Sequence, residues 1–202
     1  MKLLWKLTAI AFILSGCFFG STLVFTEEDA SGRENLVFNA DLEGGEFENN
    51  RPEDSLPLGW MVMPLKGDKK TTIRWDNLEA HNGTRSIRVD TDDTNISLIS
   101  EAFEIKPRSA YYTRFYMKLN GDDQLGIKAV LAAFDEHGQM LNETRHRQTI
   151  ADGWTKVEFS AAFFKKNAKF ARIIVQIDTG RNYRLWIDDF ASYEVYRFTT
   201  TD

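Results

Sequence analysis

Hydrophobic and polar residues alternate in short runs over most of this chain, with turn residues between the runs. The run 110–119 alternates most clearly: one expected face carries Tyr111, Thr113, Phe115, Met117 and Leu119, and the other carries Tyr112, Arg114, Tyr116 and Lys118. Alternation with a period of two residues indicates a half-buried β-strand. No window of 12 residues after Asn35 keeps a helical period, so the body of the chain is predicted to be all-β.

Further runs of the same kind give about ten strands, at a spacing of roughly 8–12 residues that is typical of a β-sandwich. Gly, Asn and Asp residues mark the turns between them, as at 120–123 and 152–153. The clearest of the other strand-like runs are 86–90, 124–135, 140–148, 154–162, 169–178 and 183–198. We therefore expect an antiparallel sandwich over residues 35–198, preceded by a polar linker at 26–34.

Residues 1–25 follow a different pattern, which is that of a targeting segment. Lys2 and Lys6 precede a run from Leu7 to Phe25 that contains no charge. Leu14-Ser15-Gly16-Cys17 resembles the lipobox of bacterial lipoproteins, and Cys17 is the only cysteine, so Cys17 is the predicted lipidation site. The alternative is an uncleaved membrane anchor, because the uncharged run is just long enough to span a bilayer. Both interpretations place the body outside the cytoplasm, tethered to a membrane of the cell envelope.

Composition excludes several classes of function. The net charge is −5 at pH 7, so the broad basic surface that nucleic-acid binding needs is not expected. One cysteine cannot form an internal disulfide, and the three histidines lie far apart in the sequence. No HExxH pair, phosphate loop or nucleophile elbow occurs, and the characteristic motifs of jelly-roll glucanases and lyases are missing. We therefore do not expect an enzyme.

Six short segments, in order along the chain, resemble carbohydrate-binding modules of families four, nine and twenty-two. They are NLVFNADLE (35–43), LGW (58–60), AHNGTRSIRV (80–89), YTRFYMK (112–118), GWT (153–155) and LWIDDF (185–190). The resemblance implies a jelly-roll β-sandwich of the galactose-binding-like type. It also implies a polysaccharide or oligosaccharide partner.

Carboxylates near both ends of the chain suggest a metal site. Asp41, Glu43 and Asp188 would meet if the first and last strands adjoin, and Ca²⁺ prefers carboxylate and carbonyl oxygens. The family resemblance implies a structural calcium there, with side-chain oxygens from Glu43 and Asp188 and carbonyl oxygens from Asp41 and Asn82. The alternative is that these carboxylates lie on the surface and pair with lysines.

A ligand site is predicted on the polar face of the strands. Aromatic rings and fixed hydrogen-bond donors suit a sugar, while the alternative is an ordinary solvated sheet face. Trp60 and Trp75 lie near loops, where they would stack on a sugar ring or pack at the rim. The other candidates are Tyr112, Arg114 and Tyr116 on one strand, and Lys128, His146, Arg172 and Gln176 on its neighbours.

The predicted function is non-catalytic polysaccharide binding, with a structural or protein-interaction role in the envelope as the alternative. A groove carrying Arg114, Lys118, Lys128 and Arg172 on an acidic protein would favour uronic-acid or sulfated glycans. The competing idea is that these cations only balance nearby acids such as Glu143 and Glu158, and that a bound glycan is neutral and stacked on Tyr112 and Tyr116. An open groove with both tyrosines exposed would favour sugar binding there, whereas a filled or covered face would favour the structural role.

Overall fold

The computed structural model describes residues 24–46, 55–66, 72–92, 95–121, 124–177 and 182–199. The predicted targeting segment, including Cys17, lies outside these residues except for its last two positions. Within the described ranges, no helix has the length and apolar character that a membrane crossing requires.

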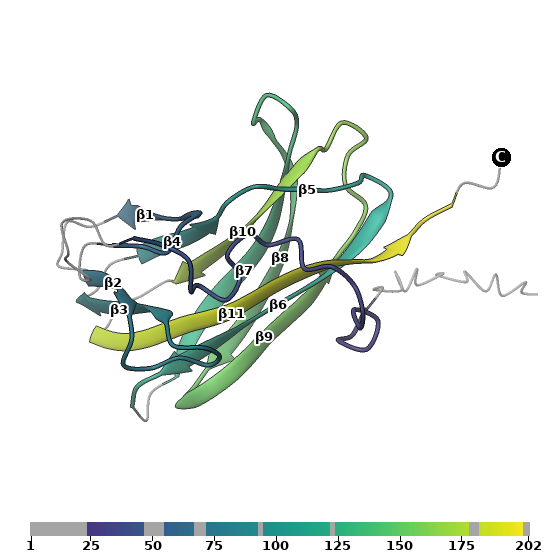
Figure 1. The fold of residues 1–202 in the computed structure, drawn as a ribbon. Coiled ribbons are helices and arrows are strands. Elements are labelled where there is room, and N and C mark those ends of the chain that lie inside the picture. Colours follow the sequence, from purple (N-terminus) through teal and green to yellow (C-terminus); the bar gives the residue numbers. More distant parts are fainter. Residues whose placement is uncertain are drawn as a thin grey trace, which may run out of the picture.

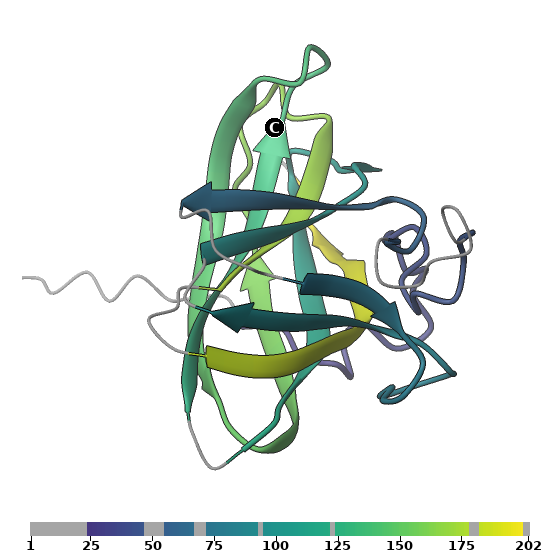
Figure 2. The ribbon, with the colours of Figure 1, turned by 90° about the vertical axis from the view of Figure 1, so that its left-hand side faces the viewer.

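Eleven strands in the described residues form two antiparallel sheets packed face to face, as Figure 1 shows, and Figure 2 shows the same layers after a quarter turn. The six-stranded sheet has the order β1 (Trp60–Lys66), β4 (Asn95–Ser100), β10 (Phe170–Ile177), β7 (Leu125–Phe134) and β8 (Met140–Ile150), with β5 (Phe103–Glu104) pairing with β10. The five-stranded sheet has the order β2 (Thr72–Asp76), β3 (Ser86–Asp92), β11 (Asn182–Arg197), β6 (Ser109–Leu119) and β9 (Gly153–Ala161). The predicted all-β sandwich is confirmed.

The core lies between the sheets and is built from alternate residues of each strand. In β10, Ala171, Ile173, Val175 and Ile177 are completely buried, and the residues between them are only half-buried. Phe115 of β6 stacks on Phe190 of β11 with ring centroids 5.1 Å apart, and Trp60 of β1 reaches the same ring from the other sheet at 4.2 Å. This alternation leaves the opposite face of each sheet free for polar side chains.

Residues 24–34, which we call the N-terminal strap, lie against the outer face of the five-stranded sheet. The backbone N–H of Phe25 donates to Ser160 Oγ at 2.8 Å, and Ala30 is buried against Ala110 and Tyr112. Figure 1 shows this purple segment beside the yellow end of β11. The expected linker at 26–34 is therefore a packed part of the domain. Phe25 and Ala30 bury apolar surface, and the many polar residues around them made the segment look like a linker in the sequence.

Candidate functional site

The structure divides the predicted ligand residues between the two sheets. Tyr112, Arg114 and Tyr116 belong to β6 of the five-stranded sheet. The other strand residues, Lys128, His146, Arg172 and Gln176, belong to β7, β8 and β10 of the six-stranded sheet. The two outer faces point in opposite directions from the core, so the prediction of one groove holding all of these residues is wrong.

The outer face of the five-stranded sheet is filled at Tyr112 and Arg114. Tyr112 is 1% exposed beneath the strap, and its hydroxyl donates to the Glu158 carboxylate. Burial, together with this bond, raises the pKa of the Tyr112 hydroxyl. Arg114 pairs with Asp189 at 3.0 Å and with Glu27 of the strap at 3.4 Å. Neither side chain is free to meet a sugar.

The same face is also occupied at Tyr116. Its ring stacks on the His81 imidazole with centroids 3.5 Å apart, and His81 in turn lies 3.3 Å from the Asp189 carboxylate. Lys118, the next outward residue, pairs with Glu79 at 2.9 Å. An open groove with exposed tyrosines is therefore not present on this sheet, and its cations balance nearby acids.

Of the two alternatives for Trp60 and Trp75, the structure shows packing within the sandwich rather than exposure to a sugar. Their exposed fractions are 6% and 3%. The Trp60 indole N–H donates to the Asn39 carbonyl at 3.2 Å, and the Trp75 indole N–H donates to the Leu42 carbonyl at 2.6 Å. Both rings thus tie the segment that precedes the first strand to the sandwich.

The outer face of the six-stranded sheet carries a row of polar donors across three strands. Arg147 of β8 lies opposite Lys128 of β7, and Lys128 lies opposite Gln176 of β10. Neighbouring strands are about 4.8 Å apart, so the three side chains form a row across the sheet with about that spacing between neighbours. No ion pair joins Lys128 or Arg147 to a carboxylate in the described residues, which leaves both charges available to a ligand.

An apolar row lies directly beside this polar row. Val130 lies opposite Ile174, Ile174 lies opposite Ile99, and Ile99 lies opposite Met61 at the edge strand. Val130 is only 1% exposed although it faces outward, so longer neighbouring side chains cover it. We call this outer surface the cationic face, and its members are Arg145, Arg147, Lys128, Arg172, Gln176, Val130, Ile174, Ile99 and Met61.

Two further arginines flank the apolar row. Arg145 lies opposite Val130 and pairs with Glu143 on its own strand. The Arg172 guanidinium donates to the Ser100 carbonyl at 2.7 Å, which holds it across the sheet. Four cations therefore gather on this face, and Glu143 is paired with one of them.

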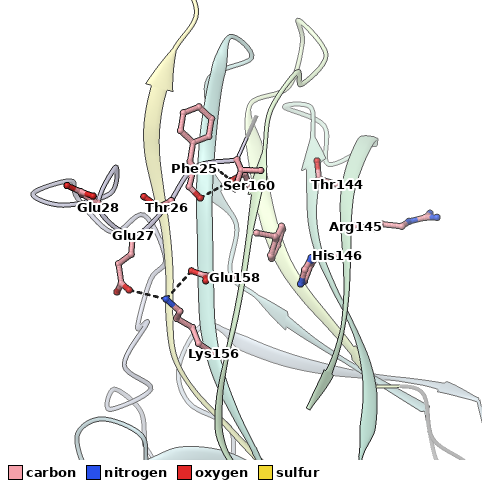
Figure 3. A pocket seen from close by; sticks show the side chains of 12 residues that line it. Phe25, Thr26, Glu27, Glu28, Thr144, Arg145, His146, Lys156, Glu158 and Ser160 are labelled. Atoms are coloured by element: carbon pink, nitrogen blue, oxygen red, sulfur yellow. Dashed lines mark hydrogen bonds and ion pairs between the residues drawn. The ribbon is translucent and has the colours of Figure 1, made fainter. Parts of the chain in front are cut away.

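His146 lies on the other side of β8 and lines a cleft of about 680 Å³ between β8, β9 and the strap. Its ring is parallel to Phe159 with centroids 5.7 Å apart. Figure 3 shows Lys156 between Glu27 and Glu158, and it shows Arg145 pointing away from them. The bond from Tyr112, followed by contacts with Lys156, lowers the pKa of Glu158, so this acid stays ionised.

Two of the residues predicted to bind calcium, Glu43 and Asp188, hold a loop. Asp188 is completely buried, and its Oδ2 accepts the backbone N–H groups of His81 at 2.6 Å and Asn82 at 3.0 Å. Glu43 accepts the backbone N–H and the hydroxyl of Thr84, both at 2.6 Å, and the N–H of Arg85 at 2.8 Å. Although burial opposes it, these bonds lower the pKa of Glu43.

This donor set does not fit a calcium ion. The carboxylate oxygens that Glu43 and Asp188 would offer to a cation already accept N–H and O–H groups. Asp41 and Asn82, the predicted carbonyl ligands, use their side-chain oxygens to accept the backbone N–H groups of Glu43 and Gly83. No three His, Cys, Asp or Glu side chains gather as a possible metal site within the described ranges. We call Glu43 and Asp188 the carboxylate clamps of loop 79–85.

This arrangement of two sheets occurs in solved carbohydrate-binding modules. Neither the protein-family models nor the curated proteins give a match. Among solved structures, the chain resembles TmCBM61 in complex with β-1,4-galactotriose, at 21% identity and a TM-score of 0.53 over 80% of this chain and 99% of that one. The chain has the jelly-roll fold of carbohydrate-binding modules. The predicted fold is thereby confirmed.

Two more modules share the fold. The Family 16 Carbohydrate Binding Module-2 matches at 13% identity and a TM-score of 0.54, over 79% of this chain and all of that one. The CBM22-1 xylan-binding domain from Paenibacillus barcinonensis Xyn10C matches at 15% identity and a TM-score of 0.50, over 72% of this chain and 92% of that one. At these identities the likeness describes the jelly-roll architecture.

Sequence reasoning missed Arg145 and Arg147 on this jelly roll and selected His146, which lies between them. The alternation in β8 contained the necessary signal, because residues one apart on a strand face opposite ways. The β7–β8 register then decides which set faces outward with Lys128, and that register places His146 beside the core residue Ala129.

Proposed function

We propose that this chain is a non-catalytic polysaccharide-binding domain and that its cationic face takes acidic glycans. The observation that carries the proposal is the row of Arg147, Lys128 and Gln176 beside the apolar row of the six-stranded sheet. A pyranose presents hydroxyl groups at its rim and C–H groups on its faces, so adjacent polar and apolar rows match both parts of the sugar.

The charges of the face favour a carboxylate-bearing or sulfated sugar. A guanidinium such as that of Arg147 pairs with a carboxylate through two parallel hydrogen bonds, and the ammonium of Lys128 adds a second positive charge. The Gln176 amide both donates and accepts, which suits a neighbouring hydroxyl. The solved neighbours include complexes and domains named for galactotriose and xylan, which supports sugar binding as the general class.

The cleft beside β9 supports binding rather than hydrolysis. Glycosidases pair an ionised carboxylate with a carboxylic acid whose pKa is raised. Glu158 has the opposite shift, because Tyr112 and Lys156 both stabilise its charge. Its neighbour Glu27 is tied to Lys156 at 3.2 Å and to Arg114 at 3.4 Å.

We further propose that the domain is tethered at the cell envelope through its N-terminal segment, by a lipid on Cys17 or by the uncharged run as a helix. The sequence carries this part of the proposal, since Cys17 lies in a lipobox-like segment and the strap begins with the last two residues of the run, Val24 and Phe25.

Affinity electrophoresis through gels that contain a glycan tests the binding proposal. We expect retardation by polygalacturonate, alginate or a sulfated glycan at low salt, and weaker retardation as salt screens the contacts. Lys128→Ala with Arg147→Ala should abolish it. Arg184→Ala is the matched control, because Arg184 is an exposed arginine that pairs with Asp90 on the other sheet.

Other results would change the assignment. Retardation by neutral galactan or xylan that ignores salt and survives both substitutions would move the site away from the cationic face. The cleft is then the next location, and His146→Ala is its test, because His146 and Phe159 provide the parallel rings there. No retardation by any glycan would favour the structural role, for which the strap that covers the five-stranded sheet is the supporting observation.

A further inference from the structure

One end of the sandwich carries a chain of aromatic rings that the proposed sugar site does not use. Phe163, just after β9, stacks on Phe198 with centroids 5.2 Å apart, and Phe198 meets Tyr196 at 5.1 Å. The Tyr196 ring in turn stacks on Phe25 of the strap, with centroids 6.2 Å apart. These four residues form what we call the end patch, and segments from both ends of the described chain contribute to it.

The end patch is open to solvent. Phe163 is 72% exposed and Tyr196 is 50% exposed, and Val24 beside them is also largely exposed. A cluster of exposed aromatic residues on a soluble surface is a feature of contact sites with proteins or membranes. Phe163 and Tyr196 form the open part of the patch, because Phe25 and Phe198 are half-buried against the cluster of Ala30, Ala110, Tyr112 and Val195.

The backbone at Phe163 gives a second and independent observation. Its φ is +62°, a left-handed conformation that is an outlier for a bulky residue. Leu42 has a similar φ of +59°, but Leu42 is completely buried, so core packing compensates for the strain. Phe163 gains no such burial, so no core packing compensates for the backbone strain of holding this ring outward.

Cations follow the patch directly. Lys165, Lys166 and Lys169 are exposed on the loop between Phe163 and β10, and none of them pairs with a carboxylate in the described part of the chain. Exposed aromatic rings flanked by lysines match the boundary of a lipid bilayer, where rings lie at headgroup level and lysines reach anionic phosphates.

The position of the N-terminus identifies the occupant. The described chain begins at Val24, beside the end patch, and the sequence before it contains the uncharged run from Leu7. A tether in that run would join the domain directly beside the end patch. We propose that the end patch docks into the headgroup layer of the membrane that holds the tether. This inference rests on the tether in the proposed function and is independent of sugar binding.

Docking at this end would fix the orientation of the domain. The end patch lies where β9 and β11 finish, whereas the cationic face is the side of the six-stranded sheet. The plane of the cationic face would then be roughly perpendicular to the membrane surface, and the face would remain accessible to glycans. A domain on a free linker would present all faces equally.

The test uses the full chain, purified as the host processes it and reconstituted into vesicles of phosphatidylcholine and phosphatidylglycerol, with or without brominated phosphatidylcholine. Phe163→Trp places a reporter in the patch. Leu78→Trp is the matched control, because Leu78 is equally exposed but lies beside Glu79, which contacts Lys118 at the opposite end of β6. Flotation reports the tether, and tryptophan quenching relative to the wild-type chain reports docking.

Each outcome decides one part of the inference. We expect both variants to float, and the added fluorescence of Phe163→Trp to fall at least twofold in brominated vesicles while that of Leu78→Trp stays constant. Flotation without quenching at position 163 would overturn docking and leave the tether intact, and so would equal quenching at both positions. Failure to float would remove the tether and docking together, whatever the result of the glycan gels.

Discussion

The carboxylate clamps make a quantitative prediction for Asp188→Ala. The substitution leaves the N–H groups of His81, Asn82 and Asp189 without the acceptor that they have at 2.6–3.0 Å. Each buried donor left unpaired costs about 1–3 kcal/mol. Asn82 lies at the surface, where water replaces part of the loss, so we take the low end of that range for all three donors. The unfolding free energy should fall by about 3 kcal/mol.

For a domain of this size that loss corresponds to about 6–12 °C in the melting temperature. Urea unfolding followed by circular dichroism measures it. Asp152→Ala is the control, because Asp152 is an exposed acid at the turn into β9, and its removal should change stability by less than about 0.5 kcal/mol. Equal stability of the two variants would refute the clamp.

Melting in EDTA separates the clamp from a calcium site. A metal that binds only the folded chain adds about 2.7 kcal/mol at a hundredfold excess over its Kd, or about 5–11 °C. The hydrogen bonds of Glu43 and Asp188 to loop 79–85 need no metal, so we expect the same melting temperature in EDTA and in calcium. A drop of several degrees in EDTA that Asp188→Ala abolishes would restore the calcium site.

Three other outcomes follow from the structure. Burial raises the pKa of Asp188 to about 6, above its ordinary value, so protonation of this group favours the folded chain below about pH 4, and this part of the stability is lost as the pH rises through 6, while the N–H bonds to the carboxylate remain. The advantage of the wild type over Asp188→Asn in urea should therefore shrink between about pH 4 and pH 6. Trp75→Phe should cost about 1–3 kcal/mol by orphaning the Leu42 carbonyl, and glycan retardation should not change. Cys17→Ser should block incorporation of labelled fatty acid, whereas a wild-type chain that never takes up the label would indicate the helix anchor.

The fold was predictable because alternation is a local property of the sequence. In β6 the residues assigned to the core side, such as Phe115 and Met117, are completely buried, and Arg114 and Tyr116 lie on the other side. A period of two separates the two faces of a strand, but it does not say which sheet the strand joins. Tyr112 and Lys128 were therefore assigned to one groove, although β6 and β7 belong to different sheets.

The remaining errors concern contacts between segments far apart in the sequence. The roles of Trp60 and Trp75 depend on carbonyls at Asn39 and Leu42, which no local pattern connects to those indoles. Glu43 and Thr84 lie 41 residues apart, so no local pattern indicated that this carboxylate would accept N–H groups from loop 79–85. Gly83 supports the clamp, because its φ is +70° and a Cβ there would lie 2.3 Å from Glu43 Oε1.

The most direct test of the central claim is a thermodynamic cycle between the cationic face and the glycan charge. Calorimetry would compare polygalacturonate with the same polymer after methyl esterification, for the wild-type chain and for the Lys128→Ala, Arg147→Ala double variant. We predict that esterification and the double substitution each weaken binding at least tenfold and that their combined effect is no larger than either alone, because both remove the same contacts. Independent, additive losses, or binding that ignores esterification, would contradict the assignment of this face to acidic glycans.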